Sequence, residues 1–169
     1  MTERPYELVH SPAGTVARVR IRGSSILSSP LLNRGTAFTA EERQALGLTG
    51  LLPSAVSTME QQLRRTYAQF GRQADDLGKN VYLANLRDRN EVLFYRLLTE
   101  HLEEMLPIVY TPTIGQAIER FSHEFRRPRG VYLSVNHPDN VEVAFRNYGM
   151  GAEDVDLIVA TDAEGILGI

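Results

Sequence analysis

A tyrosine followed by a proline turn is the feature of this sequence that most suggests chemistry. Tyr110 ends the apolar run 106–109, which we predict to be a buried strand, and it precedes Pro112 and a predicted helix. Pro112 restricts its own backbone and favours an extended Thr111, so the phenol is expected on a stiff turn in front of a helix N-terminus. A tyrosine serves as a general acid when a nearby cation brings its pKa of ~10 toward neutrality. The alternative is a packed core aromatic whose hydroxyl has a hydrogen-bond partner.

Other catalytic groups are sparse. The sequence has no cysteine and no G-x-S-x-G motif, so disulfides and thiolate chemistry are excluded and a serine nucleophile has little support. Lys79 is the single lysine among 18 basic residues. A mechanism with a lysine base must therefore use Lys79 or a residue outside this chain.

Metal and nucleotide signatures are also weak. His101 and Glu104 are three residues apart in a predicted helix, and His123 precedes Glu124, but no third ligand is indicated. We interpret His101 as a residue of a helix surface or an interface. The glycines at 149 and 151 are too close together for a dinucleotide loop. We expect no metal site and no cofactor site within this chain.

The composition describes a protein with an ordinary core. The chain has 169 residues, 43% of them hydrophobic, and a net charge of −3. This charge gives no reason to expect nucleic acid or an anionic membrane as a partner. The first ten residues lack the apolar segment of a secretory signal, and no stretch approaches the ~20 apolar residues of a membrane span. With no cysteine, a reducing compartment and hence the cytoplasm is the expected location.

The first half of the chain predicts a hairpin and capped helices. Residues 6–23 alternate with period two around a Ser-Pro-Ala-Gly turn, with arginines on one face that are either a solvated edge or a binding strip. Thr39 and Glu42 form a capping box for a helix that ends at Gly47. Ser57 and Glu60 suggest the same for a second helix.

Longer helical patterns follow. Residues 75–106 have helical periodicity with a predicted break at 87–90, and Thr113 is predicted to cap the next helix with Gln116. On that helix we expect four apolar side chains to face inward: Ala117, Ile118, Phe121 and Phe125.

After residue 128 the pattern of the sequence changes from long helical periodicity to short apolar runs. Short apolar strands are predicted at 131–135 and 155–162, on either side of a helix over 137–149, and a turn leads into the apolar residues 166–169. The predicted fold is α/β overall with a mainly helical N-terminal region: a β-hairpin extension (1–23), a helical region (24–128) and the start of an α/β domain (129–169), with a first βαβ unit and a hairpin.

Five motifs together resemble the N-terminal part of bacterial-type malic enzymes, which are related to malolactic enzymes. These motifs, in chain order, are LLNRGTAFTAEERQALGLTGLLP, RDRNEVLFYRLL, PIVYTPTIGQA, FRRPRGVYLSV and IVATDAEGILGI, and the resemblance runs from about Ile26 to Ile169. It implies NAD(P)-dependent oxidative decarboxylation of L-malate with Mg²⁺ or Mn²⁺, and a homo-oligomer. It also implies that Tyr110 is the general acid that protonates the enolate carbon after CO₂ leaves.

The resemblance places the rest of the catalytic site beyond this chain. In the family, the lysine base, the metal ligands and the Rossmann loop all follow the ILGI segment. We therefore expect the isolated chain to be inactive and to bind neither NAD, NADP nor a metal. A backbone contact of Leu167 with substrate is expected by the same resemblance.

Some positions depart from the family pattern. Many malic enzymes have an arginine where this chain has Gly165, and malolactic enzymes, which convert malate to lactate, have a similar segment. Arg65 and Arg89 match positions that bind a dicarboxylate activator in the family, but Ser57 stands where the accompanying acidic residue is expected. A malolactic enzyme and a non-enzymatic helical dimerisation module are the alternatives.

Overall fold

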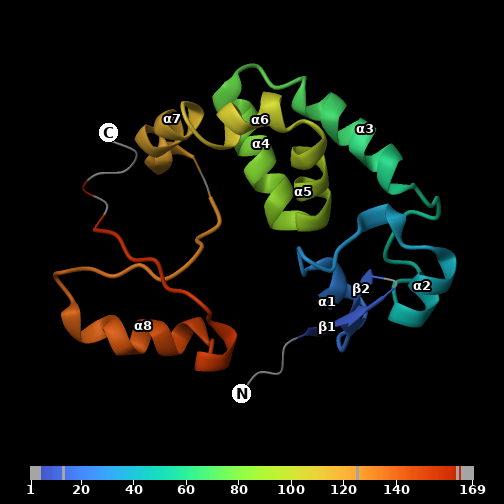
Figure 1. Cartoon of the computed structure of the whole chain (residues 1–169), viewed down its shortest axis with the longest axis horizontal. Helices are drawn as coiled ribbons and strands as arrows, with labels where there is room; N and C mark the ends of the chain where they lie inside the picture. The colour runs from blue at the N-terminus through green and yellow to red at the C-terminus, as the bar shows by residue number, and fades with distance from the viewer. Residues whose placement is uncertain (1–4, 13, 125, 163, 165–169) are drawn as a thin grey trace. The chain divides into compact units, whose positions relative to one another are not determined.

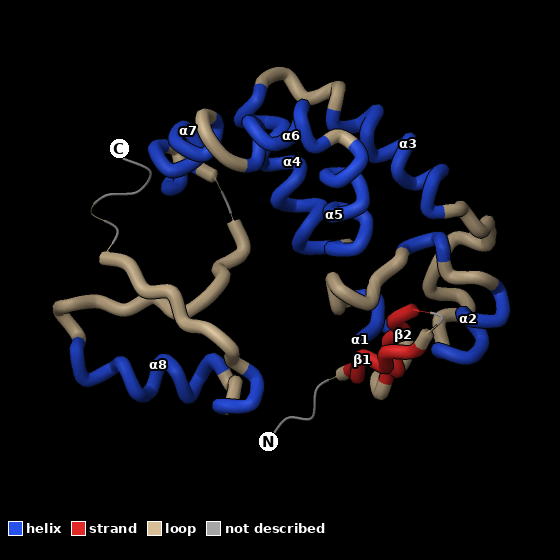
Figure 2. Tube along the Cα trace, viewed as in Figure 1, coloured by secondary structure: helices blue, strands red, loops and turns tan. Residues whose placement is uncertain are grey.

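The computed structural model describes residues 5–12, 14–124, 126–162 and 164. The chain divides into two compact units, one formed by residues 5–126 and the other by the residues from 127 onward. Helices dominate, and the strands of the described residues are confined to the N-terminal hairpin (Figures 1 and 2). The prediction of a mainly helical region preceded by a hairpin is confirmed. None of the helices in the described ranges is long and apolar enough to cross a membrane.

The hairpin has the predicted antiparallel pairing. Strand β1 (Tyr6–Ser11) pairs with β2 (Gly14–Val19), and Glu7 lies opposite Arg18. The carboxylate of Glu7 lies 3.9 Å from a nitrogen of Arg18 and 3.5 Å from a nitrogen of Arg20. Two arginines of the exposed row therefore pair across the hairpin, which favours a solvated edge over a binding strip.

Short helices and loops follow the hairpin and enclose a first apolar cluster, the loop-rich cluster. Its buried members are Ile26, Leu32, Phe38 and Leu48. They come from α1 (Ser24–Leu27), the loops around a 3₁₀ turn at Gly35–Ala37, and the segment that follows α2 (Ala40–Leu46). The predicted capping box of α2 is confirmed: Thr39 Oγ1 accepts from the Glu42 N–H, and Glu42 accepts from the Thr39 N–H.

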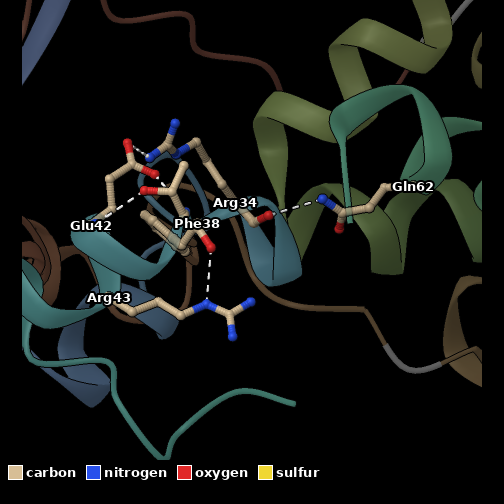
Figure 3. A network of polar contacts seen from close by, with 6 residues as sticks. Arg34, Phe38, Glu42, Arg43 and Gln62 are labelled. Atoms are coloured by element: carbon tan, nitrogen blue, oxygen red, sulfur yellow. Dashed lines mark hydrogen bonds and ion pairs between the residues drawn. The ribbon is translucent and has the colours of Figure 1, made fainter. Parts of the chain in front are cut away.

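A buried arginine organises these loops. Arg43 is only 7% exposed, and its guanidinium donates to five backbone carbonyls, those of Thr36, Phe38, Pro53, Ser54 and Ala55. Figure 3 shows the bond from Arg43 to the Phe38 carbonyl. Because these segments lack a helix or sheet to satisfy their carbonyls, one side chain supplies the donors that regular structure would otherwise provide.

The loop-rich cluster is joined to the helices by further polar contacts. Gln62 donates to the Arg34 carbonyl at 3.1 Å, while the Arg34 guanidinium pairs with Glu42 and lies over the Phe38 ring (Figure 3). The amide of Asn33 donates to the Arg89 carbonyl at 3.0 Å.

Helix α3 (Met59–Phe70) begins one residue later than predicted. Its cap is Thr58 with Gln61, so the prediction of Ser57 with Glu60 is wrong. Both pairs have the capping-box spacing. The Ser57 N–H donates to the Thr36 carbonyl at 3.0 Å, and this tertiary contact holds Ser57 outside the helix.

Helices α4 (Asp76–Arg89) and α5 (Glu91–Glu100) meet at the predicted break. Asn90 is both the C-cap of α4 and the N-cap of α5. Its N–H donates to the Leu86 carbonyl, and its Oδ1 accepts from the Leu93 N–H. The N–H of Glu91 donates to the Pro30 carbonyl at 2.9 Å, which ties the junction to the loop-rich cluster.

The predicted strand over 106–109 is instead part of a helix, α6 (Leu102–Val109), with Pro107 inside it. Met105 and Ile108 are buried, whereas Leu106 is 49% exposed. A strand would place Leu106 and Ile108 on one face, but the buried positions are three residues apart, which is helical spacing. Packing of this face against the neighbouring helices decides the structure of the short apolar run.

Helix α7 (Thr113–Glu119) follows, and its N-cap is Pro112. The prediction that Thr113 caps this helix is wrong, because Thr113 is its first residue and is 1% exposed. Ala117 faces inward as predicted, but Phe121 is 54% exposed and does not. Phe125 lies outside the described residues.

Helices α3 to α6 surround the second apolar cluster, the helical cluster. Its buried members are Leu63, Phe70, Leu83, Leu86, Leu93, Phe94, Leu97, Met105 and Ile108. Val109 is partly buried against the same cluster. The residue before Tyr110 is therefore part of the core of this unit.

The unit that begins at residue 127 contains α8 (Val141–Tyr148), which ends at Gly149 as predicted. The strands predicted at 131–135 and 155–162 are not formed, so the predicted βαβ unit is wrong for the described residues. Strand formation requires a neighbouring strand to accept and donate backbone hydrogen bonds. No such strand lies beside these segments in the described part of the unit, and Val135 and Val159 are 93% and 84% exposed.

Candidate active site

Tyr110 lies at the turn between α6 and α7 and has a firmly held backbone. Its N–H donates to the Leu106 carbonyl at 2.9 Å, and its carbonyl accepts from the Ile114 N–H at 2.8 Å. The following Thr111–Pro112 bond is cis. The turn is flanked by the buried side chains of Ile108 and Thr113. The backbone of the candidate acid is thus tied to both helices.

The side chain of Tyr110 has a different environment from its backbone. It is 52% exposed, although the residues on both sides of the turn are buried. Within the described part of the chain, its hydroxyl forms no hydrogen bond. Within the described residues, the ring is therefore not packed in a core. A half-exposed phenol on an anchored turn can reach a bound molecule and exchange its proton with solvent.

The side chain of Lys79 contacts residues of α3 and α4. Its Nζ lies 3.4 Å from Asp76 and 5.4 Å from the centre of the Phe70 ring. These partners belong to α4 and α3. Nothing in these contacts directs the ammonium toward the Tyr110 turn, so Lys79 has no assigned role in the chemistry.

His101 and Glu104 both contact the side chain of Tyr67. The Tyr67 hydroxyl donates to Glu104 Oε2 at 2.8 Å, and the Tyr67 ring stacks on His101 with centroids 3.9 Å apart. The bond to Glu104, together with slight burial and the carboxylate charge, raises the pKa of Tyr67. Within the described ranges, no group of three or more His, Asp or Glu side chains is placed to hold a metal ion. His123 is exposed in a short 3₁₀ turn (Phe121–His123).

Arg65 and Arg89 are exposed, and both act on the same tyrosine. The Tyr82 hydroxyl donates to Gln69 Oε1 at 3.0 Å. Burial raises the pKa of Tyr82, and the charges of Arg89 and Arg65 oppose that rise. The charges of two arginines from different helices thus lower the pKa of one phenol. Ser57 contributes no carboxylate there.

Two predicted positions near the end of the chain, Gly165 and Leu167, lie outside the described residues. The sequence reasoning also missed two buried polar residues, Arg43 in the loop-rich cluster and Asn80 in α4. Asn80 contacts the Ile108 carbonyl, two residues before Tyr110. Neither residue has a local sequence signal, because each contacts segments that are distant or irregular.

Sequence comparisons show which proteins this chain resembles. Residues 87–169, which include Tyr110, match the family model "Malic enzyme, N-terminal domain". The chain is 61% identical over 149 residues to "NAD-dependent malic enzyme 3" of Bacillus subtilis, covering 88% of this chain. It is 47% identical over 147 residues to "NAD-dependent malic enzyme" of Acinetobacter baylyi, covering 87%. It is 42% identical over 174 residues to "NAD-dependent malic enzyme, mitochondrial" of Saccharomyces cerevisiae, covering 98%.

These similarities define the protein class. The chain belongs to the malic-enzyme family, and residues 87–169 correspond to its N-terminal domain. It spans 26% of the length of each of these three relatives.

Proposed function

We propose that this chain is the N-terminal segment of an NAD-dependent malic enzyme, in which Tyr110 is the general acid. The observation that carries the proposal is the placement of Tyr110, with a half-exposed phenol on a turn whose backbone is anchored at both ends. The similarity to NAD-dependent malic enzymes over most of the chain supports the same function.

The proposed role of Tyr110 is one proton transfer. Once malate has been oxidised and CO₂ has left, the enolate of pyruvate needs a proton on C3. The Tyr110 hydroxyl donates it, the new C–H bond completes pyruvate, and the phenolate regains a proton from solvent. A positioned acid of this kind contributes a factor of about 10²–10⁴ to turnover. The exposure of the ring supports access for both substrate and solvent.

The remaining groups of the reaction are assigned to the longer protein. The described residues do not offer the donor set of a metal site, and the sequence has no glycine-rich dinucleotide loop. No step is therefore assigned here to NAD, to NADP as the alternative, or to Mg²⁺ or Mn²⁺. The isolated chain is expected to be inactive. Cytoplasmic location and the substrate contact of the Leu167 backbone stay predictions.

The decisive experiment is Tyr110→Phe in the full-length enzyme. This change removes an oxygen and a proton but keeps the ring, so kcat should fall by roughly 10²–10⁴. KM should change much less, because the lost interaction acts in the transition state. The melting temperature should stay near that of the parent, since no hydrogen bond to this hydroxyl is lost among the described residues. Initial rates and a thermal melt on the same preparation provide the comparison.

A normal kcat for Tyr110→Phe would remove Tyr110 from the mechanism. A matched control is Tyr148→Phe, another half-exposed tyrosine, in α8, which should leave kcat unchanged. Product analysis of the parent enzyme tests the alternative function, because a malolactic enzyme would form lactate instead of pyruvate and NADH.

We also propose a homo-oligomer. Exposed apolar side chains lie on two neighbouring helices, with Val92 and Tyr95 on α5 and Leu102 and Leu106 on α6. Clustered apolar exposure is characteristic of surfaces that associate. Sedimentation equilibrium at micromolar concentration should give a mass above 18.9 kDa for the isolated chain. A monomer mass alone would contradict association through this region.

A further inference from the structure

The end of α6 leaves a buried carbonyl without a helical partner. The last carbonyls of any helix lack intrahelical donors. For Ile108 the donor four residues later would be the N–H of residue 112, and Pro112 has none. Ile108 is 5% exposed and belongs to the helical cluster. A carbonyl in this position therefore needs a donor from elsewhere in the protein.

Asn80 supplies this donor. Its Nδ2 lies 2.7 Å from the Ile108 carbonyl oxygen, and Asn80 is 5% exposed. Its Oδ1 is buried and has no hydrogen-bond partner within the described residues. A carbonyl accepts but cannot donate, so the amide nitrogen must face Ile108. This single bond sets the orientation of the Asn80 amide.

Asn80 belongs to α4, which packs against both α6 and α7. Its bond is therefore made to the helix end from which the Tyr110 turn departs, and it is made from the helix that supports both sides of that turn. The Tyr110 backbone is held locally by Leu106 and Ile114. The Asn80 bond adds the connection between this local turn and the rest of the helical cluster.

We propose that Asn80 is a positioning residue for Tyr110. By satisfying the carbonyl that Pro112 leaves without a donor, it fixes the end of α6 and hence the direction in which the phenol leaves the turn. Its effect on catalysis rests on the proposed function of Tyr110. Its effect on the geometry of the turn does not.

The test compares two buried amides in the full-length enzyme. Asn80→Leu removes the donor while keeping a similar shape. Gln62→Met is the matched control, since Gln62 is 3% exposed and donates to the Arg34 carbonyl of the loop-rich cluster. Loss of a buried donor should destabilise both variants. Displacement of a catalytic group should lower kcat of Asn80→Leu by about 10-fold or more with little change in KM, but not that of Gln62→Met.

A double variant separates positioning from general damage. If Asn80 acts through Tyr110, Asn80→Leu should lower kcat far less in a Tyr110→Phe background than in the parent enzyme. Equal reductions in the two backgrounds would show an effect independent of Tyr110 and would overturn the inference. If Asn80→Leu does not fold, Asn80→Ala, which also lacks the donor but is smaller, takes its place.

Amide hydrogen exchange gives a readout that does not depend on activity. In the Asn80 variant, the amides of Tyr110 and Ile114 should exchange faster than in Gln62→Met, since both belong to the turn. Equal exchange in the two variants would overturn the inference. Faster exchange together with a normal kcat of Tyr110→Phe would support Asn80 as the anchor of the turn and reject the proposed acid.

Discussion

The loop-rich cluster and the helical cluster satisfy their backbones in different ways. In the loop-rich cluster, Arg43 donates to five carbonyls of irregular segments. In the helical cluster, the helices satisfy most of their own backbone groups, and Asn80 is needed only where α6 ends. A buried polar side chain thus organises a whole region in one case and a single turn in the other.

Because of this difference, substitutions in the two regions should affect different properties: stability around Arg43 and turnover around Tyr110. Changes around Arg43 should unfold the chain more readily, because many carbonyls lose their donor together. Changes around Tyr110 should affect turnover more than stability, because its phenol is half exposed and its backbone is held independently of the hydroxyl. The next three predictions test the first half of this contrast.

Arg43→Ala should have the largest effect on stability. It leaves five carbonyls without their side-chain donor, and a single unsatisfied buried group costs about 1–3 kcal/mol. Because water reaches part of the resulting space, we expect a total loss of roughly 3 kcal/mol in the free energy of unfolding. Urea titration followed by circular dichroism measures it. Arg72→Ala, at an exposed arginine, is the control and should change stability by less than about 0.5 kcal/mol.

Gly35→Ala should lower the stability of the fold by an intermediate amount. Gly35 has a φ of +54°, and a Cβ there would lie 2.9 Å from Gln62 Oε1. We expect a loss of about 1–2 kcal/mol from the backbone conformation, with an additional cost from the contact. Gly50→Ala is the matched control, because Gly50 has a φ of +82° but no atom within 4 Å of such a Cβ. Equal losses for the two variants would show that the contact with Gln62 costs nothing.

The smallest expected effect is the pH dependence that Glu42 gives to the free energy of unfolding. Burial raises the pKa of Glu42, but the bond and charge of Arg34 and the bond from the Thr39 N–H outweigh it, so the pKa lies below 4.5. A lowered pKa in the folded state stabilises the protein above the unfolded value, and this contribution is lost as pH falls through the folded value. Since the pair is more than a third exposed, we expect less than about 1 kcal/mol.

Unfolding free energies of the parent and Glu42→Gln, measured from pH 7 downward, test this prediction. The difference between the two proteins should shrink below pH 4.5. A difference that stays constant through this range would mean that the charge of Glu42 contributes nothing to stability.

Local patterns predicted those elements whose determinants lie within a few residues. The cap of α2 and the break at Asn90 are examples, since both depend on bonds to residues three or four positions away. The start of α3 was missed because two overlapping capping boxes are present, and a contact with Thr36, far along the chain, selects Thr58 over Ser57.

Apolar runs were harder to interpret. The short run that ends at Val109 suits a strand or a buried helix equally well by composition, and packing of Met105 and Ile108 decides for the helix. The runs at 131–135 and 155–162 have strand composition, but no described strand pairs with them. Composition indicates how readily a segment can form a strand and does not supply its partner.

The candidate site was only partly predictable. The motif around Tyr110 identified this residue and its proline turn. The segment before Tyr110 was predicted to be a strand, whereas it is the end of α6. The contribution of Asn80 could not be predicted, because it is 28 residues from the carbonyl that it contacts. Arg43 is similar, since its partners are carbonyls of irregular loops that no local pattern identifies.

The shared cap at Asn90 also limits how this protein can change in length. Because α4 ends and α5 begins at the same residue, there is no linker in which an inserted residue can be absorbed. One additional residue within the first turn of α5 would rotate the rest of that helix by about 100°. Leu93 and Leu97 would then turn away from the helical cluster. Length variation among related chains should therefore be rare at this junction.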